Sequence, residues 1–332
     1  MEFCSNFNFK IEKLVDVIKQ RNVQRLYIQL PEGFQQCIKF IIDNIRRLLD
    51  RDIEIFISAN PSYGSCLVDE YGARTVSADL IIHFGHTPYP YYTYNSEVLF
   101  IPVEYTGIDK LRILKIIENL NLKECDKICL ATSAQHATVV ESICTSIERC
   151  KCIYRDIIMG CRPVPSNDCS LLIVVSGGRF HCIAQALFEY GKNGFQSLSK
   201  ILCLDPYNYN LWSPVKDVEK ILKVRMWKMF QAISAKRWLI IDGFYGQHRE
   251  DIVARLAELL KTNGKEYYIV KALKLDREFL INIEAGRNFD AVVVASCPYL
   301  AFDFTDLDKP VLTVGEAYSV LHGDINRYAY PW

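Results

Sequence analysis

The chain carries no excess of charge of either sign. Its 332 residues include 39 Lys and Arg and 39 Asp and Glu, so the formal net charge at pH 7 is +0. A broad basic surface for nucleic acid or anionic lipid is therefore not expected. With 50% hydrophobic and 23% charged residues, the chain has enough apolar side chains to build a core, which excludes intrinsic disorder.

Long hydrophobic runs are also lacking. The longest apolar stretches, near 171–175 and 291–302, are shorter than the roughly 18–20 residues that cross a bilayer. The N-terminal sequence MEFCSNFNFKIEKL has no basic start followed by a continuous apolar stretch, unlike a secretory signal. We therefore expect a cytoplasmic protein with no membrane contact and no direct contact with nucleic acid.

Closely spaced cysteine pairs are missing, although cysteine is abundant. None of the 13 cysteines belongs to a C-x-x-C pair, which argues against zinc ribbons and thioredoxin-like redox sites. Cys125 and Cys129 have the spacing that begins the loop of common radical enzymes, but Thr132 stands where the third cysteine would be. Because the number of cysteines is odd and no export signal is visible, we expect no disulfide framework.

The sequence does contain one α/β pattern three times. Short apolar strands alternate with amphipathic helical segments such as 35–49, 137–148 and 249–262, which is typical of parallel sheets covered on both faces. The predicted strands are 25–30, 53–58, 79–84 and 98–102, then 127–131, 152–158, 170–175 and 200–204, then 237–242, 267–270, 290–295 and 310–314. We therefore predict three similar α/β domains, 1–108, 109–215 and 216–332, each a four-stranded parallel sheet flanked by helices.

One cysteine per unit lies just beyond a predicted strand, beside Gly or Pro. These are Cys66, Cys161 and Cys297. Ligands of open α/β sheets bind beyond the carboxyl ends of strands. A lone cysteine there is more often a small buried hydrophobe, but three at matching edges favour a shared metal site where the domains meet. Three thiolates suit an iron–sulfur cluster or zinc, although structural zinc usually needs a fourth protein ligand.

Among the other cysteines, only Cys182 is a candidate neighbour of that site, because it adjoins the loop 177–181. We interpret the remaining ones as packing residues.

Motifs at the same strand ends carry a family resemblance. In order they are Leu30-Pro31-Glu32-Gly33, 60–66 (NPSYGSC), 78–86 (ADLIIHFGH), Gly177-Gly178-x-Phe180-His181, Gly246-Gln247-x-Arg249 and Ser296-Cys297-Pro298. With these motifs the chain resembles the archaeal-type diphthamide-biosynthesis enzymes, the 2-(3-amino-3-carboxypropyl)histidine synthases, from about Leu30 to Glu316.

This resemblance implies three homologous domains around a central [4Fe-4S] cluster, held here by Cys66, Cys161 and Cys297. It also implies that S-adenosylmethionine binds at the open iron and that the reduced cluster breaks its bond to the methionine side chain. The resulting 3-amino-3-carboxypropyl radical would attack C2 of a histidine in translation elongation factor 2, releasing methylthioadenosine. A homodimer and a reductant protein are implied as partners.

Several residues near the strand ends are candidates to bind S-adenosylmethionine. Gly177 and Gly178 would use backbone N–H groups, and His181, Gln247 and Arg249 would use side chains.

We assign no general base. His83 is expected in the core or next to the ligands rather than as a ligand itself. His86 and His136 are open candidates for lining the site, and His248 and His322 are expected at the surface.

The chain departs from the family pattern at three places. The second cysteine follows Asp156-Ile157-Ile158-Met159-Gly160 rather than Gly-Gln-x-Leu-Gly. Tyr299 stands where Arg is common, although Asp303 in the same loop is retained, and the late Leu-Thr-Pro-Gly-Glu segment has Val314 in place of Pro. These changes affect the expected contacts around the cysteines but leave the three cysteines themselves in place.

Two other functions remain open. A quinolinate synthase-like dehydratase would use a cluster held by three cysteines as a Lewis acid, and a non-catalytic partner subunit of a diphthamide synthase would keep only the fold. Release of methylthioadenosine separates both from the transferase.

Overall fold

The computed structural model describes residues 2–120, 127–148, 150–284, 286, 288–326 and 328–330. The chain forms two compact units. The first comprises residues 1–109 and 134–137, and the second comprises 110–133 and 138–332.

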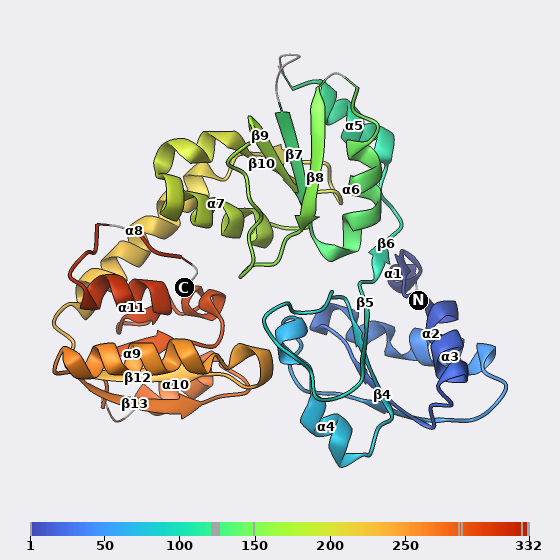
Figure 1. Cartoon of the computed structure of the whole chain (residues 1–332), viewed down its shortest axis with the longest axis horizontal. Coiled ribbons are helices and arrows are strands. Elements are labelled where there is room, and N and C mark those ends of the chain that lie inside the picture. Colours follow the sequence, from blue (N-terminus) through green and yellow to red (C-terminus); the bar gives the residue numbers. More distant parts are fainter. Residues whose placement is uncertain are drawn as a thin grey trace. The chain divides into compact units, whose positions relative to one another are not determined.

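The first unit is built on an all-parallel sheet with strand order β3-β2-β4-β5 (Figure 1). Its strands are β2 (Arg25–Gln29), β3 (Glu54–Ile57), β4 (Leu80–Phe84) and β5 (Val98–Ile101), and a separate antiparallel pair joins β1 (Phe7–Asn8) to β6 (Glu104–Tyr105). The helices are α1 (Glu2–Ser5), α2 (Ile11–Gln20), α3 (Ile38–Leu48) and α4 (Glu70–Thr75), with 3-10 turns η1 (Glu32–Cys37), η2 (Ser65–Leu67) and η3 (Ala134–His136).

Alternate residues of this sheet are buried on opposite faces. Leu26 and Ile28 pack with α2 and α3, whereas Tyr27 and Ile81 pack with Val68 and α4. Because both faces are covered, the strands read as almost continuous apolar runs.

The second unit contains two sheets. One has the order β11-β10-β9-β7-β8, with strands β7 (Lys127–Thr132), β8 (Lys151–Ile157), β9 (Leu171–Val175), β10 (Ile201–Leu204) and β11 (Leu211–Trp212). Figure 1 shows α7 (Phe180–Asn193) on one side of this sheet and α5 (Lys110–Glu118) and α6 (Ala137–Cys144) on the other. The 3-10 turn η4 (Phe195–Lys200) precedes β10.

The other sheet of this unit is all parallel, in the order β13-β12-β14-β15. Its strands are β12 (Arg237–Asp242), β13 (Glu266–Lys271), β14 (Ala291–Val294) and β15 (Val311–Thr313). The helices are α8 (Val215–Ala232), α9 (Glu250–Thr262), α10 (Arg277–Glu284) and α11 (Val314–Leu321), and the 3-10 turns are η5 (Tyr245–Gln247) and η6 (Pro298–Phe302). One face packs with α8, α9 and α11, and the other packs with α10 and η6.

The predicted α/β class and the predicted strands are confirmed, each to within two residues at either end. The second sheet differs in having a fifth strand, β11, which pairs antiparallel with β10. Two residues are too few to show a strand pattern in a sequence. The three-domain division stays a prediction; the second and third sheets lie within one compact unit.

The expectation of no disulfides is wrong. Four disulfides join cysteines whose Cα atoms lie 5.4 to 5.8 Å apart: Cys4–Cys37, Cys129–Cys169, Cys144–Cys152 and Cys182–Cys203. These separations lie within the range that a disulfide spans, and an odd total does not prevent eight of the 13 cysteines from pairing. Cys182, predicted to adjoin the metal site, instead bonds to Cys203 in the core. Cys125 lies outside the described residues.

No helix among the described residues has both the length and the apolar run needed to cross a membrane.

Candidate metal centre

The loop that carries Cys66 follows β3 in the first unit, and its backbone is held on both sides of the cysteine. The hydroxyl of Tyr94 donates to the carbonyl oxygen of Ser65 at 3.0 Å, and Gln29 Nε2 donates to the carbonyl oxygen of Leu67 at 2.9 Å. Ser65, Leu67 and Gln29 are buried, whereas Cys66 is partly exposed. The thiol is thus presented at the carboxyl edge of the sheet by a fixed loop.

A chain of hydrogen bonds runs from Gln29 to two histidines. Gln29 Oε1 accepts from the Asp69 backbone N–H at 3.1 Å and lies 3.0 Å from His83 Nδ1, and His83 Nε2 lies 2.9 Å from His86 Nδ1. Since Oε1 only accepts, His83 carries its proton on Nδ1, and His86 donates from its own Nδ1. Burial lowers the pKa of His83 well below its ordinary value, and nearby His86 lowers it further. His83 is fully buried, so its predicted place in the core is confirmed.

The loop that carries Cys161 lies in the second unit and forms a tight turn. Met159 and Arg162 pair as an isolated antiparallel bridge around it. The hydroxyl of Tyr299 donates to the carbonyl oxygen of Gly160 at 2.8 Å. A Cβ atom on Gly160 would lie 2.5 Å from the Tyr299 ring and 2.7 Å from the Phe180 ring, so only glycine fits between them.

The third candidate, Cys297, precedes η6, and its backbone carbonyl oxygen accepts the Leu300 backbone N–H at 3.1 Å. Burial raises the pKa of its thiol to about 12, and the neighbouring Cys161 raises it too. The second unit therefore brings Cys161 and Cys297 together. Two neighbouring cysteine side chains, one with a raised thiol pKa, are a donor set that a metal centre would stabilise as thiolates.

The disulfides separate the candidate ligands from most other cysteines. Among the described residues, the cysteines outside disulfides are Cys66, Cys161 and Cys297, all partly exposed, and the buried Cys150. Since a thiolate ligand must be outside a disulfide and within reach of a metal, the three predicted ligands have the required state and exposure.

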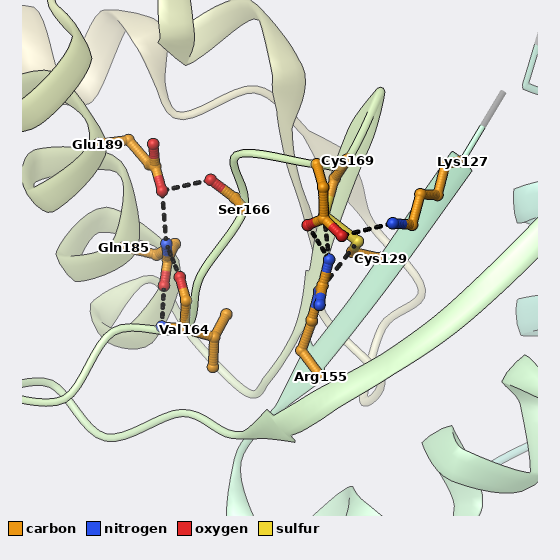
Figure 2. Close-up of polar contacts among 9 residues, drawn as sticks. Lys127, Cys129, Arg155, Val164, Ser166, Cys169, Gln185 and Glu189 are labelled. Carbon is orange, nitrogen blue, oxygen red and sulfur yellow. Dashed lines mark hydrogen bonds and ion pairs between the residues drawn. A yellow bond between two sulfur atoms is a disulfide. The ribbon is translucent and has the colours of Figure 1, made fainter.

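A second group of metal-ligand type lies at the amino end of β7 and does not fit a cation. Ligand atoms of Cys129, Asp168 and Cys169 lie within 4.8 Å of one another. However, the two sulfurs form a disulfide, and the Asp168 carboxylate is paired with Lys127 and Arg155 (Figure 2). Arg155 Nε also donates to the Cys129 sulfur at 3.2 Å. A cation would have to displace both basic side chains.

The predicted glycine turn after β9 has two distinct constraints. Gly178 has φ +67°, a left-handed conformation that favours glycine, and a Cβ on Gly177 would lie 2.3 Å from the Tyr207 ring. The Gly178 N–H donates to the Asp205 carboxylate at 3.2 Å. This N–H is therefore already engaged within the chain, and the Asp205 carboxylate places negative charge at the turn.

Two buried polar atoms flank this turn without a hydrogen-bond partner in the described part of the chain. They are Ser176 Oγ and His181 Nδ1. Burial lowers the pKa of His181 to about 4, so its imidazole is neutral at pH 7. Buried polar atoms normally have partners, and a polar ligand at this strand end would supply them.

The last two predicted binding residues follow β12. Gln247 is buried, and a Cβ on Gly243 would lie 2.6 Å from Gln247 Cβ and 2.9 Å from Ser296 Cβ. Gln247 and Ser296 thus flank Gly243, which places Gln247 near the residue that precedes Cys297. Arg249 is the N-cap residue of α9.

The histidines outside the cysteine loops differ in their exposure and in their contacts. His248 is exposed as predicted, yet its Nδ1 lies 2.7 Å from the buried Asp242 carboxylate, which also pairs with Lys271 at 2.9 Å. His136 is buried against Tyr105. Sequence reasoning missed Asp242, although an acid closing an apolar strand is a visible signal.

An apolar cavity of about 620 Å³ opens beside the third cysteine loop, between α7, α8 and η6. Its walls include Phe180, Ile183, Tyr299 and Phe302, and its charged lining residues are Asp303, Arg179, Lys220 and Arg225. Burial raises the pKa of Asp303. The cavity combines aromatic walls with one carboxylate next to Cys297.

The fold and these cysteine loops define an α/β protein, built mainly on parallel sheets, with candidate thiolate ligands at strand ends. Sequence comparison shows its family. The family described as "Putative diphthamide synthesis protein" matches residues 30–331. The chain belongs to this family.

Individual relatives agree with that membership. The chain is 26% identical to human 2-(3-amino-3-carboxypropyl)histidine synthase subunit 1, over 98% of this chain and 75% of the human protein. It is 28% identical to the chicken protein of the same name, over 98% and 80%. The crystal structure of Dph2 from Pyrococcus horikoshii with a 4Fe-4S cluster has the same fold, with a TM-score of 0.81 and 24% identity over 97% of this chain and 93% of that one.

Proposed function

We propose that this protein transfers the 3-amino-3-carboxypropyl group of S-adenosylmethionine to C2 of a histidine in translation elongation factor 2 and releases methylthioadenosine. The observation that carries the proposal is the set of cysteine loops: Cys161 and Cys297 lie together in one unit, and Cys66 follows the carboxyl end of a strand in the other. Membership of the family described as "Putative diphthamide synthesis protein" supports a role in diphthamide synthesis.

We propose Cys66, Cys161 and Cys297 as the ligands of a [4Fe-4S] cluster. Three thiolates leave one iron open, which suits a cluster that also binds substrate. When bound, the cluster supplies the electron that breaks the sulfonium bond. The related Dph2 structure from Pyrococcus horikoshii contains such a cluster, which supports this assignment.

The surrounding side chains would bind and orient S-adenosylmethionine. Arg249 is suited to its carboxylate, because a guanidinium pairs with carboxylates through two parallel hydrogen bonds. The Asp205 carboxylate at the glycine turn favours the ammonium or sulfonium end instead. Ser176 Oγ and His181 Nδ1 are buried polar atoms that such a ligand would satisfy. Fixing which sulfonium carbon faces the cysteine loops would determine which bond breaks.

The proposed assembly is a cytoplasmic homodimer supplied with electrons by a reductant protein. The curated relatives are named as subunit 1 of a synthase, so a different partner subunit is the alternative to a second copy of this chain.

The transfer can be tested directly. The anaerobically reconstituted and reduced protein is mixed with elongation factor 2 and S-adenosylmethionine labelled in its aminocarboxypropyl carbons. We expect label on one histidine-containing peptide, and none when Cys297→Ala replaces the wild type. Absence of label with an intact, reducible cluster, or equal labelling by the Cys297→Ala protein, would reject the proposal. Arg249→Ala should weaken S-adenosylmethionine binding while the cluster is retained.

A further inference from the structure

We infer that Gln29, Gln185 and Arg225 are positioning residues, each of which sets the backbone of one cysteine loop from inside the core. The inference rests on the proposed function, since it takes Cys66, Cys161 and Cys297 as ligands. All three positioning side chains are 0% exposed, and each binds peptide groups within four residues after its cysteine.

Gln29 holds the Cys66 loop at three peptide groups. Its Nε2 donates to the carbonyl oxygens of Leu67, at 2.9 Å, and Pro61, at 3.4 Å, and its Oε1 accepts the Asp69 N–H. These groups lie on both sides of Cys66. The Leu67 carbonyl and the Asp69 N–H fix which way the amide points, and its Oε1 also accepts from His83 Nδ1 at 3.0 Å. Each polar atom of the Gln29 side chain therefore has a defined partner.

Gln185, on α7, does the same for the Cys161 loop (Figure 2). Its Oε1 accepts the Val164 N–H at 2.9 Å, and its Nε2 donates to the Val164 carbonyl at 3.0 Å, so one amide side chain satisfies both backbone groups of one residue. The same Nε2 donates to Glu189 at 3.2 Å, and Glu189 accepts from the Ser166 hydroxyl. The backbone three to five residues after Cys161 is thus tied to a helix.

Arg225, on α8, serves the Cys297 loop. Its guanidinium donates to the Ala301 carbonyl at 3.0 Å and to the Val311 carbonyl at 2.7 Å, and it pairs with the buried Glu316. It therefore joins η6, which follows Cys297, to β15 and α11. The sequence marks it as well, because Arg225 falls on the apolar face of α8 with Leu222 and Met229.

This arrangement goes beyond ordinary stabilisation of loops. Burying a polar side chain costs free energy unless its hydrogen-bond partners are in place. These side chains therefore favour the one loop geometry that supplies the partners. At the opposite ends of the sheets, aspartate side chains anchor the backbone. Asp79 accepts the backbone N–H groups of Gln24 and Arg25, and Asp290 accepts those of Lys236 and Arg237. These are similar side-chain-to-backbone anchors, far along the strands from the cysteine ends, and they provide matched controls.

The test uses Gln29→Met and Gln185→Met in the reconstituted full-length protein, with Asp79→Asn and Asp290→Asn as controls. Methionine keeps the volume of glutamine but makes none of its hydrogen bonds. The readouts are the rate of iron loss to an anaerobic chelator, the electron paramagnetic resonance spectrum of the reduced cluster and the Tm of the apo protein. We expect iron loss about tenfold faster in both methionine variants, with a changed spectrum, as is usual when the groups that orient metal ligands are lost.

The controls should lower Tm without changing iron loss or the spectrum. If a methionine variant does not fold, Gln29→Asn or Gln185→Asn replaces it, because asparagine keeps the amide on a shorter side chain. The same faster iron loss and altered spectrum are expected of these asparagine variants. Arg225 is left intact because its removal would strand the Glu316 charge in the core.

The outcomes separate this inference from the proposed function. If single Cys→Ala changes at 66, 161 and 297 lose iron but the glutamine variants keep the wild-type rate and spectrum, the positioning role is wrong and the ligand set stands. If iron loss follows apo Tm equally in glutamine and control variants, the glutamines are only structural. If the Cys→Ala proteins keep their iron, the ligand set fails, and the inference fails with it.

Discussion

The hydroxyl of Tyr299 donates to the carbonyl oxygen of Gly160. The residue two positions after Cys297 is therefore hydrogen-bonded to the residue just before Cys161. The first unit repeats this contact in its own loop, where the Tyr94 hydroxyl donates to the carbonyl of Ser65, the residue before Cys66. The family resemblance predicts Arg at this position. Tyr299 has a structural role here, because its phenol ties two cysteine loops of the second unit together.

Removing that hydroxyl should loosen the second unit. Tyr299→Phe leaves the Gly160 carbonyl without this donor and should lower the free energy of unfolding by about 1–2 kcal/mol. Chemical denaturation of the apo protein measures the change. Tyr318→Phe is a suitable control, because Tyr318 is only partly buried and stacks on His322. Equal effects of both substitutions would argue against a specific role for the Tyr299 hydroxyl.

The Tyr299 ring also lies so close to Gly160 that a side chain at position 160 would overlap it. Gly160→Ala would place a methyl group 2.5 Å from the Tyr299 ring, and relief of this overlap should cost about 1–3 kcal/mol. Gly33→Ala, whose Cβ would meet nothing within 4 Å, should be close to neutral. Thermal unfolding of both variants checks this, and a Gly160→Ala protein as stable as the wild type would show that the rings move aside.

The buried ion pair of Arg225 and Glu316 should show strong coupling. Arg225→Met alone leaves a carboxylate at 0% exposure and should cost about 3–5 kcal/mol, whereas Arg225→Met with Glu316→Gln should cost markedly less. A double-mutant cycle of unfolding free energies gives the coupling. Additive single costs would mean that the two charges do not stabilise each other.

His181 should make the apo protein less stable in mild acid. Because burial lowers its pKa from 6.5 to about 4, the unfolded chain takes up this proton as the pH falls below about 6.5, and the folded chain does so only near 4. The unfolding free energy should therefore fall between these pH values, by at most about 3 kcal/mol. His181→Gln should flatten this dependence, leaving the part due to His83. An unchanged slope would mean that His181 is already solvated.

The central strands could be predicted most easily because they are buried on both faces. Segments such as 237–242 and 171–175 are then apolar throughout, and their length and boundaries are visible in the sequence. The strand β11 and the disulfide partners could not be predicted, because two-residue strands and contacts between distant cysteines leave no local pattern in the sequence.

The cysteine loops were predictable for a different reason. Each candidate cysteine follows a strand, so its place at a sheet edge comes from the fold class alone. The groups that hold those loops were missed. Gln29 and Gln185 look like isolated polar residues in apolar segments, and only the structure shows which peptide groups they bind.

The most direct test of the central claim is the fate of S-adenosylmethionine without any protein substrate. The reconstituted protein is reduced anaerobically with S-adenosylmethionine, and the nucleoside product is identified by chromatography and mass spectrometry. The proposed transferase releases methylthioadenosine, which shows that the bond to the aminocarboxypropyl group is the one broken. Release of 5′-deoxyadenosine, or no cleavage by a protein whose cluster is intact and reducible, would contradict it.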